Sequence, residues 1–186
     1  DRTVFIDERG RFLEENREFA LIAGSLCREM KGVVVAPVST SRLVEEVATG
    51  LGCRVEYTPV GSIYVARRML DLIARGTPVV MGGEGNGGLI YPDHQFCRDG
   101  AMTAARMVSL VSRFGKPLSE LADSLPRYHM IKEKFRTGDA RAIVGCLAKR
   151  YAGEKPDLTD GMRLNREDSW ALVRASGTEP LIRRTV

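Results

Sequence analysis

Residues 78–88 read PVVMGGEGNGG, and this stretch decides how the chain is expected to fold. Its first part, Pro78–Met81, is a short apolar run typical of a buried β-strand. Five glycines follow within the seven positions 82–88, so the backbone can turn tightly and approach a ligand closely. The two remaining side chains are Glu84, an acceptor, and Asn86, which both donates and accepts. This pair suits the hydroxyls of a sugar.

Apolar strands alternate with amphipathic segments around this stretch. Apolar runs at residues 33–36, 55–57 and 79–81 predict strands, and the segments between them show helical spacing. The helix predicted at 61–74 carries Ile63, Met69, Leu70 and Ile73 as its apolar residues. A later helix, opening at Arg98-Asp99-Gly100, is predicted to turn inward Ala101, Ala104, Ala105, Val108, Val111 and Phe114. This βαβαβ order is typical of a largely parallel sheet with helices on both faces.

The last third of the chain has a different pattern. Residues 128–135 predict a strand, residues 139–151 a helix, and residues 158–174 an antiparallel hairpin. The predicted fold class is therefore α/β: a βαβαβ sheet domain with helices on both faces, followed by a smaller α+β domain with an antiparallel sheet. The two domains are expected to join near residues 122–127.

Composition excludes several function classes. The net charge is +4, but the 28 lysines and arginines are spread along the chain and only 6% of residues are aromatic, which argues against nucleic-acid binding. No apolar stretch has the length needed to span a bilayer. The four cysteines form no CxxC pair, so we expect reduced thiols acting as small core residues in a cytoplasmic protein rather than a zinc site.

A second candidate loop, Arg174–Pro180, has the residue types of a phosphate-binding site. The Arg174 guanidinium matches phosphate oxygens, and the Ser176 and Thr178 hydroxyls are donors. Gly177 lets backbone N–H groups turn toward an anion. The alternative is an ordinary turn with an exposed arginine.

Residues 83–88 also satisfy G-x-G-x-x-G, so a dinucleotide-binding oxidoreductase is a rival interpretation. That motif requires a helix that opens at its last glycine and holds the pyrophosphate. Here Leu89-Ile90-Tyr91-Pro92 follows, which predicts a strand or loop. A merely flexible turn is the third interpretation.

Three stretches resemble the α-D-phosphohexomutases, the family of phosphoglucomutases and phosphomannomutases. Residues 82–88 are similar to the family's sugar-recognition loop in its archaeal-type form, and Arg174–Pro180 is similar to its C-terminal phosphate-binding loop. Asp1-Arg2 resembles the tail of its metal loop, D-x-D-x-D-R. The resemblance implies that residues 1–13 are the tail of a second domain. Residues 14–122 would be a third α/β/α domain with the sugar loop, and residues 123–186 a C-terminal α+β phosphate-binding domain.

The resemblance further implies an isomerase of carbohydrate metabolism. A full-length member moves phosphate between C1 and C6 of glucose or mannose phosphate through a phosphoserine and a hexose 1,6-bisphosphate, which also activates it. The resemblance implies that Glu84 and Asn86 contact the O3 and O4 hydroxyls of the sugar. It implies that a phosphate is bound by Arg174, Ser176, Gly177 and Thr178. Asp1 would be one of three Mg²⁺ ligands, and Arg2 would make a catalytic contact near the reacting phosphate.

The chain has no counterpart of the family's serine loop or of two metal aspartates. By the resemblance it is a C-terminal fragment that is inactive alone, and its partners are a hexose phosphate and the N-terminal domains of the same protein. A non-catalytic sugar-phosphate binding module is the alternative.

Overall fold

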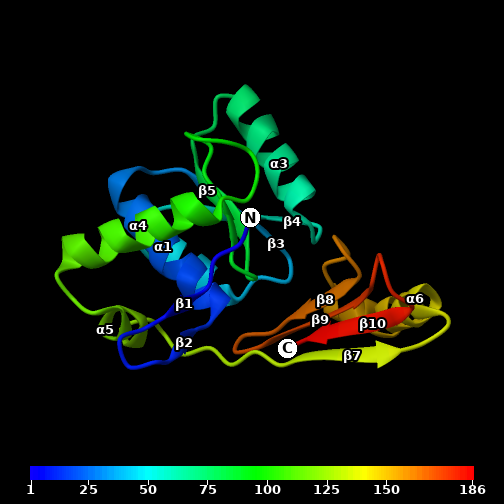
Figure 1. Cartoon of the computed structure of the whole chain (residues 1–186). Coiled ribbons are helices and arrows are strands. Elements are labelled where there is room, and N and C mark those ends of the chain that lie inside the picture. The colour runs from blue at the N-terminus through cyan, green and yellow to red at the C-terminus, as the bar shows by residue number, and fades with distance from the viewer. The chain divides into compact units, whose positions relative to one another are not determined.

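The apolar runs of the sequence form the central sheet of the first of two units. The computed structural model describes residues 1–186, and its units are Asp1–Tyr128 and His129–Val186 (Figure 1). The first unit's larger sheet has the order β4-β3-β5-β6. Its strands are β3 Val33–Pro37, β4 Arg54–Thr58, β5 Val79–Glu84 and β6 Gly88–Ile90. β3 runs parallel to β4 and β5, whereas β6 is antiparallel to β5.

Helices cover both faces of this sheet, which confirms the predicted fold class. They are α1 Glu15–Glu29, α2 Arg42–Gly50, α3 Ser62–Ala74, α4 Gly100–Phe114 and α5 Leu118–Asp123. Because successive side chains of a strand point to opposite faces, β3 divides between two cores. Val34 and Ala36 join the core with α1, α2 and α4, and Val33 and Val35 join the core with α3.

The predicted inward face of α4 was largely wrong, although Val111 packs against the core. α4 buries Thr103, Met107 and Leu110, whereas Val108 is 69% exposed and Phe114 is 42% exposed. The sequence misled because this alanine-rich helix has two stripes at helical spacing, and the buried one contains a threonine. The Thr103 hydroxyl accepts a hydrogen bond from the Tyr91 hydroxyl at 3.0 Å, which satisfies it inside the core.

Of the four apolar residues that the sequence analysis named on α3, only Met69 lies in the core. The other three, Ile63, Leu70 and Ile73, are exposed. A narrow stripe is enough to cover this side of the sheet, so the remaining apolar residues of the helix are left outside it.

The second unit is built on an antiparallel sheet of order β7-β10-β9-β8. Its strands are β7 Lys132–Arg136, β8 Met162–Asn165, β9 Trp170–Ala175 and β10 Leu181–Thr185. Helix α6 Ala140–Arg150 packs against β9 and β8, and a short 3₁₀ turn, η1 Ala152–Glu154, follows it. The predicted hairpin at 158–174 is the β8–β9 pair, and the strand predicted at 128–135 is β7, which begins later.

The cysteines are all free, but only two lie in the core. Cys27 and Cys53 are buried, whereas Cys97 and Cys146 are exposed. The prediction of core thiols was therefore wrong for the last two, which stand on the loop before α4 and on the outer side of α6. Burial, together with the neighbouring Cys53, raises the pKa of the Cys27 thiol to about 12. No helix is both long enough and apolar enough to cross a bilayer, and the cytoplasmic location stays a prediction.

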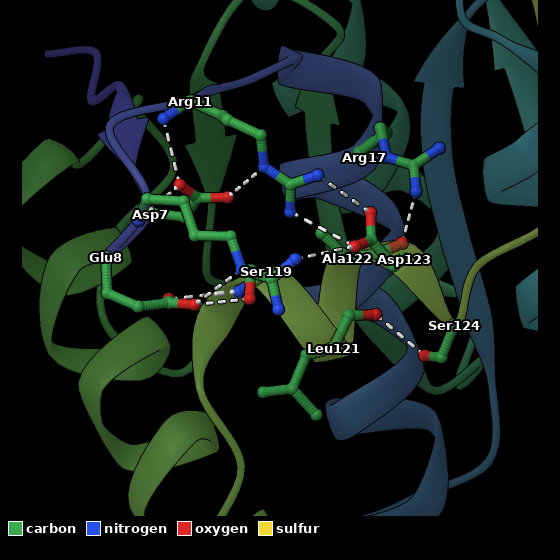
Figure 2. Close-up of polar contacts among 10 residues, drawn as sticks. Asp7, Glu8, Arg11, Arg17, Ser119, Leu121, Ala122, Asp123 and Ser124 are labelled. Carbon is green, nitrogen blue, oxygen red and sulfur yellow. Dashed lines mark hydrogen bonds and ion pairs between the residues drawn. The ribbon is translucent and has the colours of Figure 1, made fainter.

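The first residues of the chain form a small hairpin, β1 Phe5–Ile6 and β2 Phe12–Leu13, which is tied to α5 (Figure 2). Arg11 donates to Asp7 Oδ2 at 2.8 Å and to Asp123 Oδ2 at 3.1 Å. Glu8 accepts from the Ser119 hydroxyl, and Arg17 of α1 donates to the Ala122 carbonyl. Burial opposes ionisation of Asp7, but N–H groups of Arg11 lower the pKa of that carboxyl. This polar cluster fixes the path of the chain into α1.

Candidate functional site

The glycine-rich stretch is the turn of a β-hairpin rather than a free loop. β5 continues through Gly82 and Gly83 to Glu84, and β6 begins at Gly88, with Glu84 paired to Gly88. Gly87 has φ +78°, a conformation that glycine adopts without strain. The sequence analysis ended the strand at Met81 because glycines are rare in strands. Here they are needed, since a Cβ on Gly82 would stand 2.7 Å from Val65 Cγ1.

Gly85, at the tip of the hairpin, lies against the first turn of α1. A Cβ there would overlap the amide of Asn16, which is buried. The hydrogen bonds that hold Asn16 include one that its side chain accepts from Ser41 N–H at 3.1 Å and one that it donates to Glu14 Oε1 at 2.6 Å. The absence of a side chain at position 85 therefore sets the distance between the hairpin and α1.

Glu84 and Asn86 retain hydrogen-bonding capacity. Glu84 is buried, and its Oε2 lies 3.6 Å from Arg98 Nη1, beyond a good hydrogen bond. The Asn86 Oδ1 accepts from Gly88 N–H at 3.2 Å, while its Nδ2 has no partner within the chain. A buried carboxylate and a free amide donor can hold adjacent hydroxyls of a ligand.

The structure brings Asp1 and Arg2 to this hairpin. Thr3 anchors them, because its N–H donates to Gly87 O at 3.1 Å and its hydroxyl donates to Gly100 O at 2.7 Å. Arg98 Nη2 then donates to Asp1 Oδ2 at 2.7 Å. Four of the predicted site residues, Asp1, Arg2, Glu84 and Asn86, thus belong to one unit and one neighbourhood.

Arg98 is a site residue to which the sequence analysis gave no role. Its guanidinium lies between the carboxylates of Asp1 and Glu84. The sequence feature that could have indicated Arg98 is its position directly before Asp99. Asp99 caps the N-terminus of α4, because its side chain accepts a hydrogen bond from Met102 N–H at 2.9 Å. That hydrogen bond is the main reason why the pKa of Asp99 is lowered.

The residues present do not form a complete Mg²⁺ site, in keeping with the single ligand that the resemblance implies. The chain contains no group of three or more His, Cys, Asp or Glu side chains that could hold a metal. Asp1, predicted as one of three ligands, is paired with Arg98, and its role as a metal ligand stays a prediction. A single carboxylate in an ion pair falls short of the oxygen shell that Mg²⁺ requires.

The second candidate loop lies between β9 and β10 in the other unit. Arg174 is the second-last residue of β9. Its side chain is partly buried, and its Nη1 lies 3.7 Å from Asp160 Oδ2. Gly177 and Thr178 are exposed, and their backbone N–H groups and the Thr178 hydroxyl have no partner within the chain. Free donors beside a guanidinium are what an anion site needs.

Arg183 is a second residue that the sequence analysis missed. It lies opposite Arg174 in the β9–β10 register. Its Nε is 3.4 Å from Ser176 Oγ, and its Nη2 is 2.5 Å from Glu179 Oε2. The sequence spacing could have indicated Arg183, because a strand that follows the loop and pairs with β9 places position 183 opposite position 174. Two guanidinium groups therefore flank the loop.

The dinucleotide-binding interpretation of residues 83–88 was wrong. The strand β6 follows Gly88, and the next helix, α4, does not begin until Gly100. The hairpin therefore offers no helix N-terminus at its last glycine to hold a pyrophosphate.

Helix α1 contains a buried carboxyl group that the hydrophobic periodicity of the sequence did not predict. Glu18 is fully buried, and neither of its carboxylate oxygens has a hydrogen-bond partner. Burial, with smaller contributions from Glu15 and Glu14, raises its pKa to about 8.

Comparison with known proteins shows which family the chain resembles in sequence. Residues 14–128 match the model of the α/β/α domain III of phosphoglucomutase/phosphomannomutase. The chain is 46% identical, over 98% of its length, to a phosphoglucomutase/phosphomannomutase of Thermococcus kodakarensis, and covers 40% of that relative. It is 38% identical over its whole length to a probable phosphoglucosamine mutase of Methanopyrus kandleri, and covers 41% of it.

The fold has a counterpart among solved structures. A phosphoglucomutase/phosphomannomutase family protein from Burkholderia thailandensis superposes with a TM-score of 0.82 at 22% identity, covering 99% of this chain and 39% of that one. The chain thus spans about 40% of the length of the relatives it matches.

Proposed function

The chain belongs to the phosphoglucomutase/phosphomannomutase family, and from this premise we propose that it supplies the sugar-recognition hairpin and the phosphate loop of a phosphohexomutase. Its relatives carry the names of isomerases that act on phosphorylated glucose, mannose or glucosamine. The proposed substrate class is accordingly a hexose phosphate. The proposed hairpin contacts serve all of these sugars, because the hydroxyls that it would bind are common to them.

The hairpin carries this proposal. Glu84 is held at the end of β5 with an oxygen not engaged in a good hydrogen bond, and Asn86 at the turn keeps a free Nδ2 donor. We assign the two side chains to neighbouring hydroxyls of the sugar. Glycines 82, 83, 85 and 88 are fixed by close packing, so the two groups are held in place before the ligand arrives. Preorganisation of this kind limits the entropy lost on binding.

The phosphate loop supports the same substrate class. Arg174, Ser176, Gly177 and Thr178 are proposed to hold a phosphate group through one guanidinium, two hydroxyls and backbone N–H groups. Arg183 braces the loop through Ser176 and Glu179 and adds a second cation. Charge-assisted hydrogen bonds of this kind contribute about 1.5–3 kcal/mol each.

In the complete reaction, we propose, phosphate moves between C1 and C6 of the hexose by way of a phosphoserine and a hexose 1,6-bisphosphate. Contacts to the sugar hydroxyls and to the non-reacting phosphate can serve both orientations of the sugar. Arg2, beside the hairpin, is proposed to contact the reacting phosphate. We expect these 186 residues by themselves to be inactive, because they contain no counterpart of the serine loop.

The test is a ¹H–¹⁵N NMR titration of the 186-residue chain with glucose 1-phosphate, with NAD as the control ligand. We expect shifts at residues 82–88 and 174–178 with the sugar phosphate and none with NAD. Glu84→Gln should abolish the shifts of the hairpin. Glu56→Gln, which removes a carboxylate from β4 that pairs with Arg68, should leave them unchanged.

Two results would contradict the proposal. One is the absence of any shift at either loop with glucose 1-phosphate at millimolar concentration. The other is turnover of glucose 1-phosphate to glucose 6-phosphate by the purified chain, measured with a coupled dehydrogenase. Turnover would refute the expected inactivity while leaving the substrate class intact.

A further inference from the structure

Four helices of the first unit, α1, α2, α4 and α5, surround a cavity of about 120 Å³. None of its lining residues belongs to the glycine-rich hairpin. Leu21, Leu110 and Leu121 are buried in its wall, and Phe114, 42% exposed, is the most exposed apolar residue of the lining. An apolar cavity of comparable size holds one benzene-sized group. The cavity therefore has the size and the lining for one small apolar body.

The packing of α1 on α2 keeps the cavity from closing. A Cβ built on Gly24 of α1 would stand 2.9 Å from Val47 Cγ1 of α2. The two helices are thus already in close contact along one wall, and protein interiors at this density do not compress further. The cavity is a fixed feature of the helix packing.

The polar residues that line the cavity include a cation without a partner. Arg28, in the last turn of α1, is exposed and forms no ion pair or hydrogen bond within the chain. The carboxylate of the next residue, Glu29, is taken by Arg113, and no acidic side chain lines the cavity. The half-buried Ser25 hydroxyl, one turn before Arg28, has no partner either. A free guanidinium and a free hydroxyl together can hold a carboxylate.

The backbone decides which way such a ligand would lie. α1, α2 and α4 contribute residues from their later turns, such as Val47 and Phe114, so their C-terminal ends lie at the cavity. Helix C-termini carry free carbonyl groups and a partial negative charge, which disfavours an anion inside the cavity. At Arg28 the full positive charge of the guanidinium favours an anion. A ligand with its apolar body inward and its carboxylate at Arg28 satisfies both conditions.

We propose that this cavity is a second binding site of the chain, for a small monocarboxylate with a single-ring or branched apolar body. The site is separate from the sugar hairpin, so the proposal does not depend on the proposed function. Arg28 and Ser25 would bind the carboxylate, and the leucines of the wall would bury the apolar body.

The test is an NMR titration of the 186-residue chain with benzoate, with its neutral counterpart benzamide, and with acetate, which lacks the apolar body. Benzoate should shift the amide signals of Gly24, Phe114 and Leu121 with a dissociation constant in the millimolar range. Benzamide should bind about three- to fivefold more weakly, because an exposed charge pair contributes less than about 1 kcal/mol. Acetate should leave these signals unmoved.

Arg28→Ala should lower the affinity for benzoate about three- to fivefold and leave that for benzamide unchanged. Arg67→Ala, which removes an exposed arginine without a partner from α3, is the matched control and should change neither affinity. Ser25→Leu, which places an apolar side chain into the cavity, should weaken benzoate and benzamide alike. Saturating glucose 1-phosphate should not displace benzoate.

Three results would overturn the proposal. The first is no shift at the lining residues with benzoate at tens of millimolar. The second is equal affinity for benzoate and benzamide, which would make the cavity an apolar site without an anion subsite. The third is an equal response to acetate, which would leave Arg28 as a surface cation without a specific ligand.

Discussion

Replacing Glu18 with glutamine should flatten the pH dependence of stability of the first unit. Glu18 is fully buried without a hydrogen-bond partner, and its pKa is raised from 4.5 to about 8. In the unfolded chain it ionises above pH 4.5, whereas in the native state it keeps its proton until about pH 8. Unfolding between these values releases a proton, so the free energy of unfolding falls as pH rises through this window and is flat above it.

The size of the effect follows from the same values. At about 1.36 kcal/mol per pH unit, the full window corresponds to about 5 kcal/mol. Relaxation and water penetration reduce such penalties in real proteins, so we expect about 2–3 kcal/mol of destabilisation of the wild type relative to Glu18→Gln between pH 5 and pH 8.5. The buried glutamine amide carries its own cost, but that cost does not change with pH.

Urea unfolding measured by far-UV circular dichroism at several pH values is the assay. Trp170 is the only tryptophan and lies in the second unit, so its fluorescence reports on that unit separately and should not respond to the substitution. Glu29→Gln, in the last turn of the same helix α1, is the matched control and should keep the wild-type slope. Parallel pH profiles for wild type and Glu18→Gln would refute the reasoning.

Three further outcomes are expected. Gly85→Ala should destabilise the first unit by about 1–3 kcal/mol, because its Cβ must displace the buried Asn16 amide; an unchanged thermal midpoint would contradict the packing described. Leu172→Ala, at a position 1% exposed, should cost about 2–5 kcal/mol and lower the urea midpoint followed by Trp170 fluorescence; a loss below 1 kcal/mol would mean that the site collapses around the smaller residue. Arg11→Ala should cost about 1–3 kcal/mol by calorimetry, because it leaves the Asp7 carboxylate, 6% exposed, without its guanidinium partner, and an unchanged stability would contradict this.

Much of the fold could be predicted because the strands and helices follow from hydrophobic patterns among neighbouring residues. The apolar runs at 33–36 and 79–81 became strands of a parallel sheet, and the alternation around residues 158–174 became the β8–β9 hairpin. Periodicity predicts which segments are strands and helices because burial of one face acts on neighbouring residues along the chain. It failed to choose between two stripes on α4, where the choice depends on Tyr91 and its hydrogen bond to Thr103.

The candidate site divides in the same way. Residue chemistry and spacing alone pointed to Glu84, Asn86 and Arg174, because a glycine-rich turn and a donor-rich loop are local features. Their roles in binding stay predictions. The cations beside them were not foreseen, since Arg98 reaches the hairpin only through the turn of chain that precedes α4, and Arg183 reaches Ser176 only through the pairing of β10 with β9.

The sequence by itself therefore determined the order and type of most of the elements and the chemical character of two loops, whereas the strands β2 and β10 were not predicted. Only the tertiary structure decided that Asp1 meets Arg98, 97 residues away, that Arg98 fills the space over Gly88, and that Glu18 is buried without a partner. The physical reason is the range of the interactions. Backbone propensity and hydrophobic periodicity act over a few residues, whereas ion pairs, steric exclusion and desolvation act between whichever groups the fold places together.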